Sequence, residues 1–266
     1  MNRPVLFVRL VFSRSLNPSI DAERATVAIV QDVLLSAATR WSEKIVAWEP
    51  NLKARAAVDF DRAGALAEMV AVRTRTTFGF NSGRVELRGA TREFVVVVSV
   101  NDRPTRPVGG HLQMANEVTV QILTPSVAGV SSLTFAGKVF EELCVGCVPL
   151  WGAVHLDSEY RAKVMQTTPS LRAIGRDFGR FLPGLFAVNY FSDKYVELFS
   201  SSEVLALPGA RRVEHGVFLD VADPFAWEVE SERYSAALAR IGKELFFDRL
   251  APDRATVAPT FADCRE

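Results

Sequence analysis

Hydrophobic and polar residues alternate along this chain with two periods, one typical of β-strands and the other of α-helices. Two runs, residues 94–100 and 185–191, are apolar almost without interruption, which is typical of strands buried on both faces. Around Arg9, apolar residues occupy alternate positions between residues 5 and 12, which predicts a strand with one buried face. We expect the two apolar runs to be central strands, and we predict further strands at 118–123, 150–156 and 217–221.

Apolar residues recur every three or four positions in other stretches, as they do on the buried face of an amphipathic helix. Asp157 and Ser158 are expected to cap one short helix, and a second is expected at 170–178, before the turn at Pro183 and Gly184. The same period predicts longer helices at 22–41, 133–147 and 232–247, and a further short helix at 61–72.

Residues that favour turns separate these elements. Asn81-Ser82-Gly83 and Gly89-Ala90 are predicted to form hairpin turns. Residues 42–58 are expected to form a surface loop around Pro50, and residues 101–110, which include a pair of glycines, are expected to form another loop.

Both halves of the chain mix strands and helices in a similar order, although no residue-level repeat relates them. The sequence therefore predicts an α+β fold with a mixed or antiparallel sheet, or sheets, flanked by helices. An arrangement as two similar halves stays open. The expected organisation is a single domain over residues 1–266, with one linker-like stretch at 125–132 that would allow a subdivision into 1–124 and 133–266.

The composition, with 48% hydrophobic and 23% charged residues, is that of an ordinary globular protein. Lysine plus arginine equals aspartate plus glutamate at 31 each, so the chain lacks the basic excess that nucleic-acid-binding proteins usually carry. Three cysteines, an odd number, argue against a disulfide framework and for a reducing compartment. No stretch approaches the roughly 20 apolar residues needed to cross a bilayer. We expect a cytoplasmic protein that binds neither nucleic acid nor membrane.

The residues that most often carry chemistry lack the sequence partners that such chemistry needs. Cys144 and Cys147 form a C-x-x-C pair without a second ligand pair, so we expect both to be buried and predict no metal and no cofactor. His155 lies within a predicted strand, and His215 lies beside a turn. The sequence contains no HExxH and no G-x-S-x-G motif. A hydrolase that uses His155 or His215 with nearby carboxylates stays one alternative, and a non-catalytic binding module is another.

Charge is distributed unevenly along the chain. Basic residues are in excess over residues 1–106, whereas residues 214–232, called the acidic segment below, contain no lysine or arginine. This segment is either a solvated turn with a carboxylate-rich helix start, or a face that steers and binds a basic partner. Trp227 either is an apolar anchor for the partner or folds back into the core. The predicted partner-binding residues are Asp220, Asp223, Trp227, Glu228, Glu230 and Glu232.

Several short motifs in residues 130–266 resemble those of the immunity proteins of bacterial polymorphic toxin and type VI secretion systems, most nearly the immunity protein 52 family. The motifs that carry this resemblance are Leu150-Trp151-Gly152, Ile174-Gly175-Arg176-Asp177-Phe178, Leu182-Pro183-Gly184-Leu185, Asn189-Tyr190-Phe191 and Phe246-Phe247-Asp248.

The resemblance implies a cytoplasmic α+β protein without catalytic residues, encoded beside a toxin that it binds and blocks. In this family the toxin is typically a restriction-endonuclease-like nuclease. Such an enzyme has a basic DNA-binding face, which would be complementary to the acidic segment.

Overall fold

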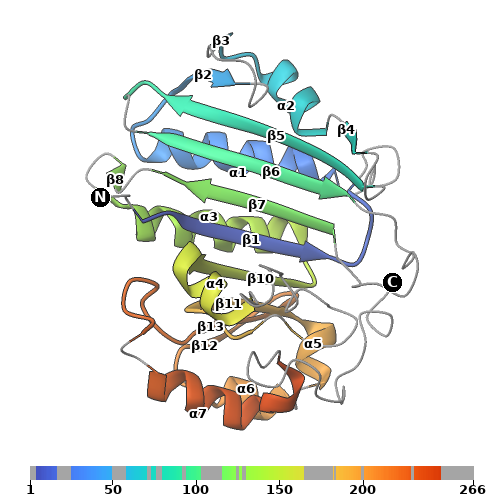
Figure 1. Cartoon of the computed structure of the whole chain (residues 1–266), viewed down its shortest axis with the longest axis vertical. Coiled ribbons are helices and arrows are strands. Elements are labelled where there is room, and N and C mark those ends of the chain that lie inside the picture. The colour runs from blue at the N-terminus through green and yellow to red at the C-terminus, as the bar shows by residue number, and fades with distance from the viewer. Residues whose placement is uncertain are drawn as a thin grey trace, which may run out of the picture.

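The computed structural model of the chain is organised around one large β-sheet, whose strands follow one another along the long axis of the molecule (Figure 1). The structure describes residues 4–16, 25–49, 58–70, 73–75, 80–91, 94–102, 116–123, 126–127, 130–164, 182, 184–198, 201–228 and 231–246. Within these ranges no helix has the length and hydrophobicity that a membrane crossing requires.

The strands of the large sheet are β1 (Leu6–Phe12), β2 (Ile45–Glu49), β3 (Val58–Asp59), β4 (Arg73–Arg75), β5 (Phe80–Gly89), β6 (Val95–Asp102), β7 (Asn116–Ile122), β10 (Trp151–Leu156), β11 (Val188–Ser192), β12 (Ala210–Val213) and β13 (Gly216–Asp220). A separate small ladder consists of β8 (Ser126–Val127) and β9 (Val130–Ser131). The helices are α1 (Thr26–Arg40), α2 (Arg62–Val70), α3 (Ser132–Cys147), α4 (Asp157–Val164), α5 (Asp193–Leu198), α6 (Ser201–Leu205), α7 (Ser231–Ile241) and the 3-10 helix η2 (Lys243–Leu245).

Neighbouring strands of the large sheet are antiparallel, in the order β12-β13-β11-β10-β1-β7-β6-β5-β2-β3, with β4 paired to β5. The N-terminal strand β1 lies in the middle, where it pairs with β7 on one side and β10 on the other. One sheet therefore contains strands from both sides of residues 125–132. This arrangement confirms the predicted α+β class with an antiparallel sheet flanked by helices.

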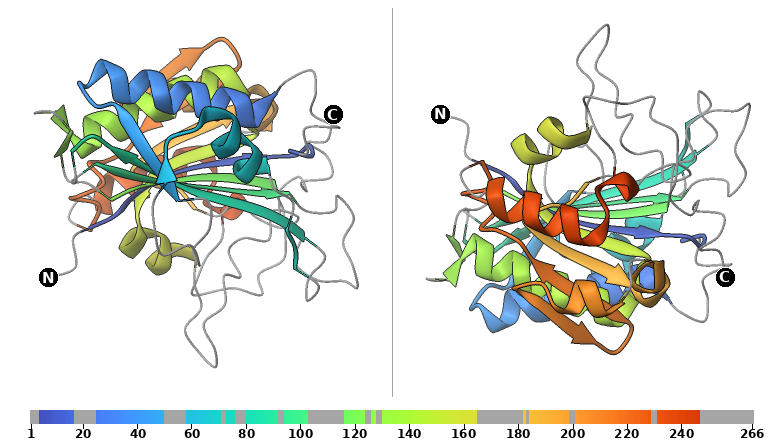
Figure 2. Two further views of the ribbon diagram at one scale, coloured as in Figure 1. Left: turned by 90° about the horizontal axis from the view of Figure 1, so that it is seen from above. Right: turned by 90° about the horizontal axis from the view of Figure 1, so that it is seen from below.

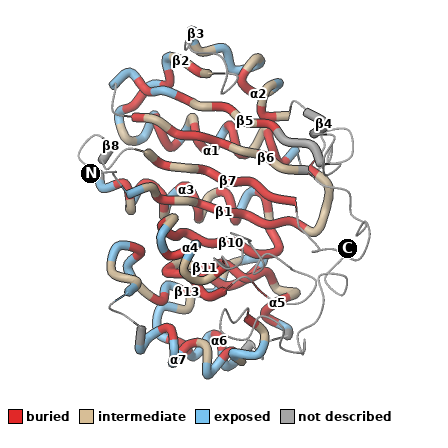
Figure 3. The backbone as a smooth tube through the Cα atoms, in the orientation of Figure 1, coloured by how far each residue is buried: buried red, intermediate tan, exposed pale blue. Residues whose placement is uncertain are grey.

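Helices cover opposite faces of this sheet (Figure 2). On one face, α1, α2 and α3 contribute to one apolar cluster that includes Leu6, Val8 and Leu10 of β1. On the other face, α4 and α7 contribute to a second cluster that includes Val11 of β1. The alternation arises because successive side chains of a strand point to opposite faces. Figure 3 shows that the central strands are the most continuously buried part of the backbone.

The two predicted central strands differ in outcome. Residues 94–100 correspond to β6, which lies between β5 and β7, and the prediction is confirmed. The strand expected at 185–191 begins only at Val188, between β10 and β13. The side chain of Asn189 accepts from the backbone N–H of Phe186 at 2.8 Å and donates to its carbonyl at 2.7 Å. These bonds hold the chain before β11 in a turn instead of a strand.

Two loop predictions in the N-terminal half are wrong. The expected loop at 42–58 contains β2, because Trp48 is buried and its neighbours pair with β5. The expected hairpin turn at Asn81-Ser82-Gly83 lies inside β5. Gly83 is there for a different reason: a Cβ at this position would overlap the carbonyl oxygen of Met69 at the end of α2.

Helix predictions are confirmed for α2, α3 and α4, and for α1 from Thr26 onward. The helix expected at 232–247 is too long, since α7 ends at Ile241. Gly242 has a φ of 111°, which an α-helix cannot accommodate, and the chain continues as η2.

Some predictions concern residues outside the described ranges. These are the helix at 170–178, most of the loop at 101–110, and the partner-binding residue Glu230.

Candidate functional site

The acidic segment begins at the turn before β13, includes β13 near one end of the sheet, and ends in the first turn of α7. Asp220 is the last residue of β13, and Glu232 lies in the first turn of α7. Asp220, Asp223, Glu228 and Glu232 are all exposed. The structure therefore places these four predicted partner-binding residues at the surface, on one continuous stretch of chain.

The middle of the acidic segment is a tight turn. The backbone N–H of Phe225 donates to Asp223 Oδ1 at 2.8 Å, and that of Ala226 donates to the Asp223 carbonyl at 2.9 Å. Pro224 between them is buried and restricts its own backbone φ angle. Phe225 is 48% exposed. The turn thus presents an aromatic side chain to solvent.

Trp227 is turned toward the interior. Its side chain is half-buried and packs against both apolar clusters of the molecule. Lys163 Nζ of α4 lies 5.6 Å from the centroid of its ring. Of the two roles that the sequence left open for Trp227, these contacts favour a core residue that fixes the acidic segment.

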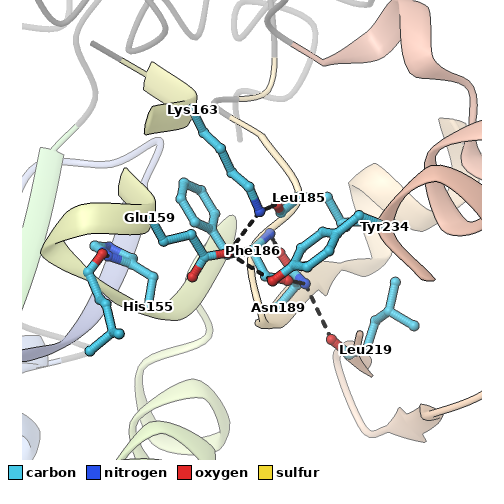
Figure 4. A network of polar contacts seen from close by, with 9 residues as sticks. His155, Glu159, Lys163, Leu185, Phe186, Asn189, Leu219 and Tyr234 are labelled. Atoms are coloured by element: carbon cyan, nitrogen blue, oxygen red, sulfur yellow. Dashed lines mark hydrogen bonds and ion pairs between the residues drawn. The ribbon is translucent and has the colours of Figure 1, made fainter. Parts of the chain in front are cut away.

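The helices α4 and α7 are joined by buried polar contacts (Figure 4). Glu159 Oε1 accepts from Lys163 Nζ at 2.7 Å and from the Tyr234 hydroxyl at 2.9 Å. Lys163 Nζ also donates to the Leu185 carbonyl at 2.6 Å and lies 3.6 Å from the Tyr234 ring centroid. One carboxylate and one ammonium thus connect α4, α7 and the turn that precedes β11.

Burial shifts the titration of this pair. The Glu159 side chain is 0% exposed, and burial raises its pKa against the opposing effects of Lys163 and of the hydrogen bonds it accepts. Burial lowers the pKa of Lys163, and the Glu159 charge opposes that shift. Each group thus stabilises the charged form of the other in a place that would otherwise disfavour it.

The two candidate catalytic histidines lie in different surroundings. His155 is buried in β10 and stacks on Phe7 and Tyr160, and burial followed by the Arg9 charge lowers its pKa to about 3. His155 is therefore neutral near pH 7. His215 is exposed on the turn between β12 and β13, 3.7 Å from Glu214. Among the described residues, no hydrogen bond or ion pair connects the two histidines.

The cysteine pair is buried in α3, as predicted. Burial, followed by the neighbouring Cys147, raises the pKa of the Cys144 thiol well above its usual range. A raised pKa disfavours the thiolate that metal binding or nucleophilic chemistry needs. Within the described part of the chain, no group of three or more His, Cys, Asp or Glu side chains could hold a metal ion.

The fold is similar to that of a Pseudomonas aeruginosa T6SS protein, PA0821, with a TM-score of 0.51 and 10% sequence identity. The similarity covers 88% of this chain and 76% of that protein. At this identity it concerns the fold alone. No protein-family model and no curated protein matches the chain.

Sequence reasoning did not identify Phe225 or the contacts among Glu159, Lys163 and Tyr234. Phe225 follows Asp223-Pro224, a pair that predicts a turn, so its exposure had a weak signal in the sequence. Glu159 and Lys163 are four residues apart, which is the usual spacing of solvent-exposed ion pairs on a helix. Only the position of α7 shows that this pair is buried.

Proposed function

We propose that this chain is an immunity protein that binds and neutralises a cognate bacterial toxin of a type VI secretion system. The observation that carries the proposal is the fold similarity to a Pseudomonas aeruginosa T6SS protein over most of both chains. The motifs of residues 130–266, which resemble the immunity protein 52 family, support the finer assignment to immunity. The protein would act in the cytoplasm, where the toxin is active.

The proposed partner is a nuclease, in the manner of restriction-endonuclease-like toxins, and it would contact the acidic segment. Asp223, Glu228 and Glu232 are exposed, and within the described ranges none of them forms an ion pair. Unpaired carboxylates attract a basic surface more strongly than paired ones, because no neighbouring cation offsets their field. A DNA-binding face carries such a basic surface.

We propose inhibition by binding, without catalytic residues in this chain. The surroundings of the histidines favour this over a hydrolase. With its pKa lowered to about 3, His155 is a poor general base at neutral pH, and three aromatic rings surround it. His215 has Glu214 as its charged neighbour on an exposed turn, so no buried carboxylate orients its ring.

The test starts from the toxin gene expected beside the gene for this chain. Its product is expressed in a bacterial host with and without this protein, and growth and DNA integrity are followed. We expect growth arrest with DNA cleavage, and full rescue by co-expression. A catalytically inactive toxin should also form a stable complex with the purified chain. Toxicity that co-expression does not relieve, together with no complex at about micromolar concentrations, would contradict the proposal.

A further inference from the structure

We propose that Phe225 is the apolar anchor of the partner surface and enters a pocket on the toxin that is rimmed by lysine and arginine side chains. This inference rests on the proposed function and deepens it, because it assigns the contact to one residue and gives the chemistry of the surface that receives it.

The exposure of Phe225 is unusual for this molecule. Most large apolar side chains in the described ranges are buried or half-buried, and the exposed ones are Val46, Val58, Val145, Leu205 and Phe225. Phe225 is the aromatic member of this group, and it is 48% exposed. Single exposed aliphatic residues are common and need no explanation. An exposed aromatic ring offers a larger apolar area, and aromatic residues are enriched in the buried centres of protein interfaces.

The backbone around Phe225 is held in place before any partner binds. Two hydrogen bonds to Asp223 close the turn on one side of the ring, and buried Pro224 restricts it further. On the other side, Trp227 packs into both apolar clusters. A side chain on a fixed turn loses little conformational entropy on binding, so more of its contact energy contributes to affinity.

Lys163 contacts the end of this turn through Trp227. Lys163 lies against Trp227 and joins Glu159 to the carbonyl of Leu185, while Glu159 also accepts from Tyr234 of α7. The start of the turn is held by β13, its end by Trp227, and the following helix by Tyr234. Lys163 thus contacts Trp227, the residue two positions after Phe225.

The surroundings of Phe225 define the kind of partner. Asp223, Glu228 and Glu232 occur within seven positions of it in the sequence, and all are exposed. An apolar ring among unpaired carboxylates is complementary to an apolar pocket with a cationic rim. The ring would supply contact energy, and the carboxylates would guide the approach.

The experiment uses the catalytically inactive toxin from the adjacent gene as the probe, with binding kinetics measured at low and physiological salt. Phe225→Ala should weaken binding at least about 30-fold, mainly through faster dissociation, since an apolar anchor acts after the encounter. The salt dependence of association should stay that of the wild type. Phe225→Lys should weaken binding more and also slow association, because it places a cation against the cationic rim.

Leu205→Ala is the matched control, because Leu205 of α6 is a large apolar side chain that is 40% exposed. This substitution should change the affinity for the toxin by less than about twofold. Both Phe225 variants should keep the wild-type melting temperature. If the wild type binds and the Phe225 variants bind within about twofold of it, the inference is overturned while the proposed function stands. If the wild type itself forms no complex, the proposed function fails.

Discussion

At the scale of single residues, we expect the buried ion pair between Glu159 and Lys163 to be the contact most sensitive to the loss of one partner. The carboxylate is fully buried, and its charged form is favoured by Lys163, by the Tyr234 hydroxyl and by a hydrogen bond from the backbone of Ala187. A buried charge that loses its partner retains the cost of leaving water without the compensating attraction. Removing one partner should therefore be more harmful than removing both.

We predict that Lys163→Met lowers the free energy of unfolding by about 3–5 kcal/mol, measured by urea denaturation. Burial already raises the folded-state pKa of Glu159, and loss of Lys163, which opposes that shift, should raise it further. The folded variant then binds more protons than the unfolded chain, so its stability should fall as pH rises from mildly acidic to neutral. Adding Glu159→Gln should remove this pH dependence and recover part of the stability. If Lys163→Met alone leaves the free energy of unfolding unchanged at neutral pH, the pair contributes nothing to stability.

At the scale of helices and strands, two glycines provide opposite tests of close packing. Gly83→Ala should destabilise the protein by about 1–3 kcal/mol, because the added methyl would overlap the Met69 carbonyl where α2 meets β5. Gly137→Ala should stabilise it by about 0.5–1 kcal/mol, because Gly137 lies inside α3 and no atom lies within 4 Å of the added Cβ. The measurement is thermal and urea unfolding of both variants. Equal effects of the two substitutions would contradict the packing of α2 on β5.

The C-terminal end of α3 depends on Arg14. Its guanidinium donates to the carbonyls of Cys147 at 2.6 Å and Val148 at 3.3 Å, and to Thr26 Oγ1 at 3.1 Å. These bonds satisfy carbonyls that have no partner within the helix and place a positive charge at the negative end of its dipole.

We predict that Arg14→Leu lowers the free energy of unfolding by about 1–3 kcal/mol, since part-buried carbonyls lose a charged donor. Arg161→Leu is the control. Arg161 pairs with Asp157 four residues earlier, and the two side chains are 60% and 46% exposed, so its loss should change stability by less than about 1 kcal/mol. Chemical denaturation of both variants checks the difference. An Arg14 variant as stable as the Arg161 variant would remove the capping role.

Most helices and strands of this fold could be predicted from the sequence, because their apolar periods are regular. The errors occur where a long-range contact decides the local structure. Gly83 is typical of a turn, but it lies inside β5 because the end of α2 approaches the strand there. Asn189 lies in an apolar run that predicts one long strand, but its side chain bonds to the backbone of Phe186 and the strand is shorter. At the candidate site, the carboxylates of the acidic segment could be predicted because no lysine or arginine occurs among them in the sequence. The exposure of Phe225 had only the weak signal of the Asp223-Pro224 pair before it, and the burial of Lys163 depends on where α7 packs, which no local pattern encodes.

At the scale of the whole molecule, charged residues are distributed unevenly along the chain although the net charge is zero. The strands that carry Arg73, Arg75 and Arg84 lie toward the β3 end, while the acidic segment includes β13 near the opposite end (Figure 1). At that end Arg211 and Arg212 of β12 form ion pairs with Glu141 and Asp193, whereas Asp223, Glu228 and Glu232 form none within the described ranges. A balanced protein with separated charges still has a directional field, which orients a charged partner before contact. The field should bring a basic partner to the β13 end of the sheet.

Neutralising three of the exposed carboxylates tests this steering. Asp223→Asn, Glu228→Gln and Glu232→Gln together should slow association with the inactive toxin by about tenfold at low salt, with little change in dissociation. Asn at 223 can still accept the hydrogen bond from Phe225 that closes the turn, and exposed charges contribute little to stability, so the fold should be unaffected. Association of the variant should also depend less on salt, because screening acts on the charges that were removed.

A matched triple variant, Glu142→Gln, Glu203→Gln and Asp157→Asn, removes the same charge from sites that already have arginine partners in the structure. If only the amount of negative charge matters, the two triple variants should slow association equally. If the location of the unpaired carboxylates matters, the first should slow it far more than the second. Equal rates for both variants and the wild type would mean that the acidic segment is a solvated turn with no part in binding. A large loss in the first variant alone, with the Phe225 variants dissociating faster, would assign approach and retention to different residues of one surface.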